Sequence, residues 1–324
     1  MKSIYDLTID ELKEYFIKIG QPKYRATQVF EHLHKGTLVH DIPNIPKELR
    51  EQIAADFCAY FPKIVTTETG SDGTVKHLLE LVDGERIECV VLSQDYGKTV
   101  CVSTQVGCRM RCAFCASGRD GFVRNLSAGE ILSQVILAKP SRVVLMGSGE
   151  PLDNFDNVMK FIELTTIGAR NISLSTVGLV DKIRQFADLK TGVNLCISLH
   201  APNDNIRQSL IPMAKKWSIK ELIESARYFF EKTGRRVIFE YSLINGINCS
   251  PENARELSNL VRGFPTHVNL INLNSTGTDF KAPPREVGLK FMDVLIKSGT
   301  SCTMRKSRGS DILAACGQLK LHTH

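Results

Sequence analysis

The chain has 324 residues and a formal net charge of +6, from 41 Lys and Arg against 35 Asp and Glu. It shows no apolar run long enough to span a bilayer and no leader of charged and then apolar residues, so we expect a cytoplasmic protein without a membrane partner. The ten cysteines are too dispersed for a secreted disulfide scaffold. Such a large number of cysteines in a cytoplasmic protein predicts a metal or thiol function.

The first 60 residues are predicted to form a small helical module. Apolar residues recur at helical spacing across 8–34, with a break at Gly20-Gln-Pro22, and a second helical stretch covers 48–57. Turn signals at Gly70-Ser-Asp-Gly73 and Asp83-Gly84 then bound short β runs, with strands near 87–92 and 99–103. We therefore expect a connecting β segment over residues 61–92.

Residues 93–324 alternate apolar strands with helical segments. Strands are expected at 142–146, 171–175, 193–198, 236–243, 267–273 and 301–305, and helices at 127–138, 155–166, 219–230, 251–261 and 285–297. This alternation is typical of parallel βα units, so the predicted fold class is α/β, with a barrel or partial barrel. In such folds the loops after the carboxyl ends of the strands carry the chemistry.

Three cysteines with C-x3-C-x2-C spacing occupy the run Gly107-Cys-Arg-Met-Arg-Cys-Ala-Phe-Cys-Ala116. Three thiolates can hold three irons of a 4Fe-4S cluster and leave the fourth iron open, whereas a structural zinc site wants a fourth ligand. The spacing resembles the cluster loop of the radical S-adenosylmethionine (SAM) superfamily, in which the open iron chelates SAM and one electron releases a 5'-deoxyadenosyl radical. Three chance cysteines, or half of a zinc site, are the alternatives.

Polar and small residues follow several predicted strands. Gly147-Ser-Gly-Glu-Pro-Leu152 would let the backbone approach a ligand while Glu150 accepts hydrogen bonds from an ammonium group. Four further polar residues follow strands: Ser175, Ser198, His200 and Asn274. Each alone is typical of a turn or a helix cap, but the four together favour a binding site.

Three further residues carry reactive groups, but their spacing in the sequence does not show that they lie together in the fold. Cys316 lies in a small-residue tail that could reach the mouth of a barrel, although a lone late cysteine is usually a small buried hydrophobe. Cys101 lies seven residues before Cys108, and Glu88 lies thirteen before Cys101.

The order of motifs resembles the RlmN branch of the RlmN/Cfr family, radical SAM enzymes that methylate adenine in RNA. The resemblance covers nearly the whole chain and rests on Cys101-Val-Ser-Thr-Gln-Val-Gly-Cys108, Arg124-Asn-Leu126, Gly149-Glu-Pro-Leu152, Ser175-Thr-Val-Gly178, Ile197-Ser-Leu-His-Ala-Pro-Asn-Asp204, His267-Val-Asn-Leu270 and Ala314-Ala-Cys-Gly-Gln-Leu319. It implies a partial (β/α)6 TIM-like barrel over residues 93–324 with a catalytic C-terminal tail. Residues 1–60 would be a small N-terminal helical domain that binds RNA.

The resemblance also implies roles for individual residues. The cluster ligands would be Cys108, Cys112 and Cys115, and the positions matching SAM binding are Gly149, Glu150, Ser175, Ser198, Leu199, His200 and Asn274. Two SAM molecules would serve each turnover. The first methylates Cys316, and the second yields the radical that takes hydrogen from this methyl group, whose carbon then adds to carbon 2 of adenine. Cys101 attacks the sulfur of Cys316 and leaves a disulfide, while Glu88 removes the ring proton.

The partners implied by the resemblance are 23S rRNA, at the peptidyl-transferase centre, and tRNA, at the adenine next to the anticodon. An external one-electron reductant such as flavodoxin is needed, and no obligate protein partner is implied. We expect phosphate contacts from the N-terminal module and from basic clusters at Lys215-Lys216, Arg235-Arg236 and Arg305-Lys-Ser-Arg308.

Four residues depart from the family pattern without removing a reactive group: Arg111, Ser148, Ser275 and Leu313. Three rival functions stay open. They are a Cfr-type enzyme acting on carbon 8 of the same adenine, a non-catalytic iron-sulfur RNA-binding protein, and a zinc protein.

Overall fold

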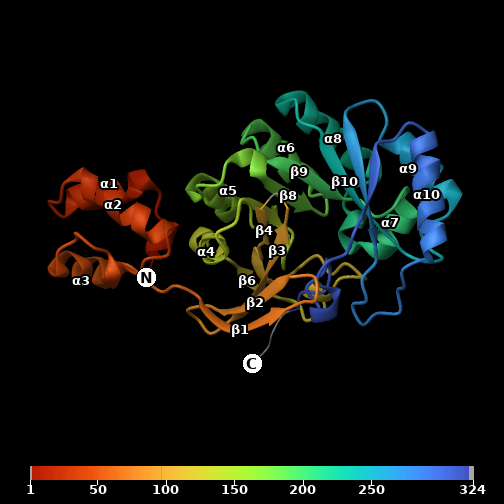
Figure 1. Ribbon diagram of the computed structural model, residues 1–324. Helices are drawn as coiled ribbons and strands as arrows, with labels where there is room; N and C mark the ends of the chain where they lie inside the picture. The colour runs from red at the N-terminus through yellow and green to blue at the C-terminus, as the bar shows by residue number, and fades with distance from the viewer. Residues whose placement is uncertain (1, 96, 321–324) are drawn as a thin grey trace.

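The computed structural model describes residues 2–95 and 97–320, and its first part is a module of three helices (Figure 1). These are α1 (Ile9–Lys18), α2 (Lys23–His34) and α3 (Lys47–Asp56). A capping box of Thr8 and Glu11 starts α1. Gly20, at φ 72°, lies in the turn that separates α1 from α2, as the sequence predicted.

The helical module contacts the rest of the chain through side chains of its own. Glu11 accepts a hydrogen bond at 2.8 Å from Lys160 of α5 (Phe155–Leu164). A ring nitrogen of His34 lies 3.0 Å from the carbonyl oxygen of Leu164. Asp6 accepts from the backbone N–H of Gly129, in the first turn of α4 (Ala128–Ala138), at 2.6 Å. The module therefore docks on the two helices α4 and α5.

A ten-stranded sheet forms the centre of the molecule. Its order is β1 (Lys63–Thr69), β2 (Val75–Glu80), β3 (Arg86–Gln94), β4 (Gly97–Cys101), β7 (Arg142–Leu145), β8 (Ile172–Thr176), β9 (Asn194–Ser198), β10 (Val237–Leu243), β11 (Thr266–Asn272) and β12 (Cys302–Arg305). Strands β1 to β4 pair antiparallel, and β4 and β7 to β12 pair parallel. The segment 61–92, expected as a connection, thus extends the sheet of the barrel.

Helices join the successive parallel strands. Besides α4 and α5 they are α6 (Val180–Asp188), α7 (Asp204–Leu210), α8 (Ile219–Thr233), α9 (Pro251–Leu260) and α10 (Arg285–Lys297). The expected α/β class and radical SAM type of partial barrel are confirmed, with β1 and β12 as the two ends of the hydrogen-bonded order. The sequence did not specify α6, α7 or the hairpin β5 (Gln105–Gly107) and β6 (Phe122–Asn125).

Alternation along the strands separates a hydrophobic layer from a polar interior. On β8, Ile172 and Leu174 are fully buried in the hydrophobic core, whereas Ser173 and Ser175 line cavities inside the barrel.

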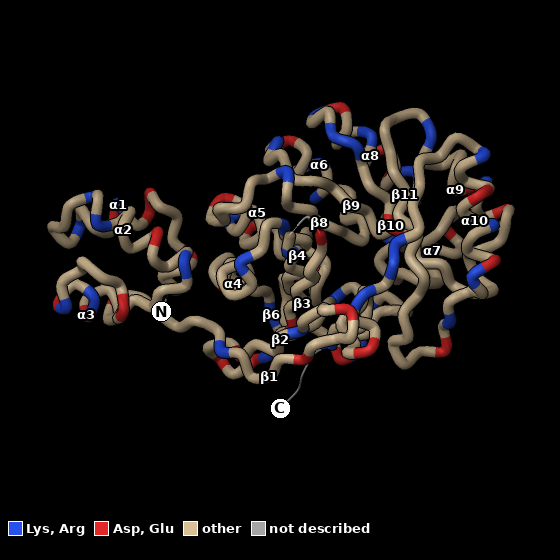
Figure 2. The backbone as a smooth tube through the Cα atoms, in the orientation of Figure 1, with Lys and Arg blue, Asp and Glu red and all other residues tan. Residues whose placement is uncertain are grey.

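Lys and Arg lie on both the helical module and the barrel (Figure 2). Within residues 2–95 and 97–320, no helix is both long enough and apolar enough to cross a membrane.

Candidate active site

The three predicted cluster cysteines lie on the loop between β5 and β6. Gly107 precedes them at φ 74°, and a Cβ added there would lie 2.3 Å from the carbonyl oxygen of Gly121, so only glycine fits. The backbone N–H of Ala116 donates to the carbonyl oxygen of Gly317 at 2.8 Å. The C-terminal tail therefore packs directly against the end of the cluster loop.

One cavity of about 160 Å³, here called the cofactor cavity, brings most of the predicted site together. The cluster loop contributes all three cysteines, and six predicted cofactor residues also line it: Gly149, Glu150, Ser175, Ser198, His200 and Asn274. Leu199 differs from these six. Its side chain is fully buried in the core and its backbone N–H donates to the carbonyl oxygen of Glu240 at 3.0 Å, so it can reach a ligand only through its backbone.

The donor set fits an iron-sulfur cluster better than a single metal ion. Among the described residues, no three Cys, His, Asp or Glu side chains surround one point as ligands of one ion would. In a cubane cluster each thiolate binds a different iron, so three thiolates spread along a cavity wall meet the requirement. Burial raises the pKa of Cys108 to about 12, so the metal charge is needed to hold it as a thiolate.

Glu150 is buried at the edge of this cavity with its carboxylate held by backbone groups. Oε1 accepts from the N–H of Leu152 at 3.0 Å, and Oε2 accepts from the N–H of Val177 at 2.8 Å. Burial raises the pKa of Glu150 to about 7. The Thr176 side chain also hydrogen-bonds to this carboxylate. A carboxylate has about four acceptor positions, so the group can still accept from an ammonium group of a ligand.

His200 is a buried neutral imidazole whose tautomer is set by a backbone contact. Its Nδ1 accepts from the N–H of Ser242 at 2.9 Å, which places the proton on Nε2. Burial, together with the charge of Arg207, lowers its pKa to about 3. The ring of Phe114 meets it edge to face at 4.9 Å. The imidazole can therefore donate, but not carry charge, in the cofactor cavity.

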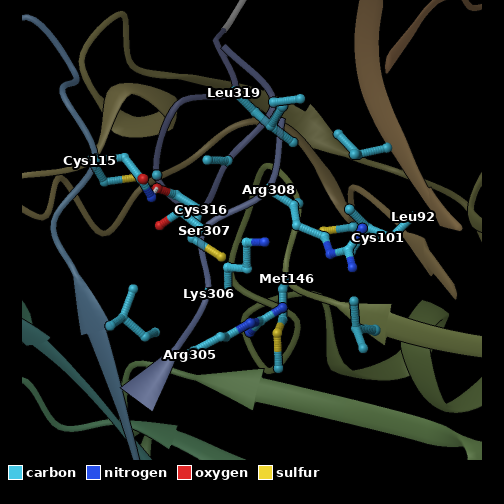
Figure 3. Close-up of a pocket in the computed structure, with 18 of the residues that line it drawn as sticks. Leu92, Cys101, Cys115, Met146, Arg305, Lys306, Ser307, Arg308, Cys316 and Leu319 are labelled. Carbon is cyan, nitrogen blue, oxygen red and sulfur yellow. Dashed lines mark hydrogen bonds between the residues drawn. The ribbon is translucent and has the colours of Figure 1, made fainter. Parts of the chain in front are cut away.

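A second cavity of about 430 Å³, the catalytic cavity, adjoins the first. Cys101 and Cys316 both line it, together with Cys115 and Arg305. In Figure 3 Cys316 lies between Cys115 and Cys101, with the side chains of Arg305 and Lys306 nearby. Burial raises the pKa of Cys101 to about 12, and the Arg305 guanidinium opposes this shift.

Comparison with known proteins agrees with this geometry. Residues 2–59 match the family model of the ribosomal RNA large subunit methyltransferase N-terminal domain, and residues 102–257 match that of the radical SAM superfamily. A probable dual-specificity RNA methyltransferase RlmN from Caldicellulosiruptor saccharolyticus is 49% identical, with 98% of this chain and 96% of the relative aligned. One from Clostridium perfringens is 46% identical over 99% of this chain and 97% of the relative. The chain belongs to the RlmN family.

A solved structure extends the match to the fold. The radical SAM methyltransferase from Sphaerobacter thermophilus superposes with a TM-score of 0.95 at 41% identity, covering 98% of this chain and 99% of that one. The radical SAM family implies SAM and a 4Fe-4S cluster as cofactors.

Glu88 lies deeper than the two cysteines expected to act with it. It is on the same face of β3 as Val90 and Leu92, which line the catalytic cavity, but its own side chain is buried. Lys76 approaches its Oε1 at 3.1 Å, and the backbone N–H of Lys320 donates to its Oε2 at 2.8 Å. The tail therefore covers the carboxylate in this structure.

The four departures from the RlmN pattern have definite places. Ser148 is buried, and its N–H donates to Ser103 Oγ at 3.0 Å. Arg111 and Leu313 both adopt positive φ, at 50° and 52°. The carbonyl oxygen of Ser275 accepts from the side chain of Gln318 at 2.8 Å, which joins this loop to the tail.

Sequence reasoning missed the buried residues that position this RlmN site. Asn248 donates to the carbonyl oxygens of His200 and Ser242. Arg207, with 2% of its surface exposed, donates to the carbonyl oxygen of Val177 beside Glu150. Neither residue lies in a motif with a chemical signature, so nothing local in the sequence marks them.

Proposed function

We propose that this chain methylates carbon 2 of adenine in RNA. The names of its relatives support RNA methylation, and the chemistry of its site supports a radical route. Its substrates would be 23S rRNA at the peptidyl-transferase centre and tRNA at the adenine next to the anticodon. It would work in the cytoplasm with an external one-electron donor such as flavodoxin. Residues 1–60, with Lys306 and Arg308 of the basic segment, would contact RNA phosphates, and residues 93–324 would perform the chemistry.

The position of Cys316 is the observation that carries this proposal. It lines both the cofactor cavity, with the cluster cysteines, and the catalytic cavity, with Cys101. Asn274 donates to its carbonyl oxygen at 3.2 Å, which ties the tail to a predicted cofactor residue. A thiol at the wall shared by two cavities can take a carbon in one and deliver it in the other.

The chemistry then follows from the residues around Cys316. Bound SAM and cluster supply a methyl group and, by one-electron cleavage, a hydrogen-abstracting radical. Cys316 would accept the methyl group as a thiolate stabilised by Arg305, lose one hydrogen atom from it, and join the resulting carbon to the electron-poor ring. The ring adduct would give back the one electron that the cleavage consumed, and Glu88 would take the ring proton. Cys101 would then attack the sulfur of Cys316, the carbon–sulfur bond would break, and the released carbon would take up a proton to become the methyl group of the product.

For Glu88 to act, its contact with the tail must change. The N–H of Lys320 occupies one oxygen of the carboxylate, and Lys76 pairs with the other. We propose that binding of the flipped base displaces the segment around Lys320 and exposes Glu88 to the ring. Lys76 would remain to stabilise the carboxylate before it accepts the proton.

The test is mass spectrometry of RNA nucleosides after anaerobic turnover with the reduced, cluster-loaded enzyme. We expect 2-methyladenosine. Cys316→Ala should abolish it while cluster absorbance and RNA binding persist, and Cys101→Ala should accumulate a covalent RNA adduct. Cys302→Ala, a partly buried cysteine outside both cavities, is the matched control and should keep activity.

Three results would contradict the proposal. Formation of 8-methyladenosine without 2-methyladenosine would assign the chain to the Cfr type. RNA binding without any methylation by the loaded enzyme would indicate a structural role for the cluster. Zinc without iron in anaerobically purified protein would exclude the radical reaction.

A further inference from the structure

Two further cavities lie at the opposite end of the barrel from the cluster loop. The first, the inner basal cavity, measures about 300 Å³ and contains Arg142, Arg170 and Arg305 among its lining residues, with the amides of Asn171 and Asn194. The second, the outer basal cavity, measures about 550 Å³ and is lined by the segments that precede β8, β9 and β10, with Lys190, Lys232 and Arg235.

The outer basal, inner basal and catalytic cavities are neighbours, each sharing wall residues with the next. The outer and inner basal cavities share Arg170 and Asn171. The inner basal cavity and the catalytic cavity share Leu92, Gln94, Val144 and Arg305, which therefore form the partition between them. On β4, Thr99 lines the inner basal cavity and Cys101 the catalytic cavity, so the two lie about 7 Å apart along one strand face.

The charge of this route is of one sign. Among the described residues that line the two basal cavities, the charged side chains are all Arg or Lys, six in number, and none is Asp or Glu. Lys232 has a half-exposed carboxylate, Asp188, at 3.8 Å. A cavity lined by one sign of charge concentrates ions of the opposite sign. At about 300 Å³ the inner cavity also reaches the size of small-molecule pockets, roughly 300–1,000 Å³.

We propose that the basal cavities admit a small anionic thiol that reduces the Cys101–Cys316 disulfide after each turnover. This inference rests on the proposed function, which leaves that disulfide. The ligand class is a low-molecular-weight thiol that carries carboxylates. Its carboxylates bind Arg142 and Arg170, while its sulfur reaches past the partition toward Cys101.

The exchange balances in two steps. The thiolate of the first molecule attacks Cys101 Sγ, the Cys101–Cys316 bond breaks, and Cys316 leaves as a thiolate beside Arg305. A second thiolate attacks the small-molecule sulfur of the mixed disulfide and releases Cys101 as a thiolate. Two thiols are oxidised to one small disulfide, and the protein disulfide takes up the two electrons.

In this proposal Arg305, which lies in the partition, must change its conformation. Its Nη1 lies 4.0 Å from Glu240 Oε2, beyond hydrogen-bond distance, so this ion pair does not lock the guanidinium in place. The side chain lines both the catalytic and the inner basal cavity. A change of its rotamer would join the two spaces and leave the cation beside the departing thiolate.

The experiment compares thiols of different charge on the oxidised enzyme. Loaded enzyme is allowed one turnover on a short RNA without added thiol, and disulfide reduction by glutathione, 2-mercaptoethanol or cysteamine is then timed by mass spectrometry. Each rate is divided by that for an exposed model disulfide, because the thiols differ in reactivity. We expect glutathione to exceed cysteamine by about tenfold, and this preference to shrink in high salt.

Variants test whether the basal arginines cause the preference. Arg142→Gln with Arg170→Gln should slow reduction by glutathione about tenfold and leave 2-mercaptoethanol unaffected. Arg170→Gln alone, which leaves Arg142 in place, should show a smaller loss, and Lys220→Gln on the exposed face of α8 should show none. Equal normalised rates for anionic and cationic thiols, or a preference that survives in the double variant, would overturn the inference.

Failure of the proposed function gives a different result. If no Cys101–Cys316 disulfide forms during turnover, the two-cysteine reaction itself is wrong. If the disulfide forms but its reduction is indifferent to thiol charge, only the basal route is wrong.

Discussion

Replacing Asn248 with alanine tests how the fold holds the cofactor cavity. The side chain is fully buried and makes three hydrogen bonds with backbone groups. Its Nδ2 donates to the carbonyl oxygens of His200 at 2.7 Å and Ser242 at 2.8 Å, and its Oδ1 accepts from the N–H of Ile244 at 2.7 Å. The amide therefore joins the loop after β9 to the end of β10.

The substitution leaves all three backbone groups buried without their partner. An unsatisfied buried donor or acceptor costs about 1–3 kcal/mol, and some relaxation or water entry reduces the sum. We therefore expect the free energy of unfolding to fall by roughly 3–5 kcal/mol, a large part of the ~5–15 kcal/mol typical of a native protein. The carbonyl of His200 loses its anchor, so SAM affinity should fall as well.

The assay is denaturant unfolding followed by circular dichroism, with calorimetric titration of SAM on the loaded enzyme. Asn157→Ala is the matched control, because that side chain donates one bond, to Asn154 Oδ1 at 2.8 Å, at a partly buried site. It should cost no more than about 1 kcal/mol. A loss below about 1 kcal/mol for Asn248→Ala, with unchanged SAM affinity, would refute the reasoning.

Three further changes test other parts of the molecule. Burial acts to raise the pKa of Glu11, but hydrogen bonds from Lys160 and other groups lower it to about 2. The Glu11 carboxylate therefore stabilises docking of the helical module fully above pH 4.5, and this stabilisation is lost as the pH falls toward 2. Because Glu11 is 35% exposed, this contribution is only ~1 kcal/mol, and hydrogen exchange of residues 1–60 should rise at low pH and in Glu11→Gln. Burial lowers the pKa of His200 from 6.5 to about 3. Its neutral form therefore favours the folded state fully above pH 6.5 and progressively less as the pH falls toward 3. In His200→Gln, the free energy of unfolding should depend less on pH over this range. In Gly149→Ala the new Cβ would lie 2.6 Å from Gln105 Cβ at φ 106°, so SAM binding should fall at least tenfold by calorimetry, and unchanged binding would show that the loop adapts.

The sequence predicted the fold and a set of candidate cofactor residues because their signals are local. Strand and helix periodicity located the parallel units, and the rule that chemistry follows strand ends selected Ser175 and Ser198, whose hydroxyl oxygens lie 3.4 Å apart. The place of the Leu199 side chain could not be predicted from its position in the motif. It neighbours two cavity residues, yet alternation along the chain turns its side chain into the core.

The sequence by itself determined the family, the partial barrel and the set of reactive groups, because the spacing of cysteines and the order of motifs are written along the chain. Only the tertiary structure decided which groups meet. Cys101 and Cys316 are 215 residues apart in sequence and share one cavity because the tail folds back on the cluster loop. Arg305, which looked like part of a surface cluster for RNA, lines the interior, since burial and cavity walls depend on packing between distant strands.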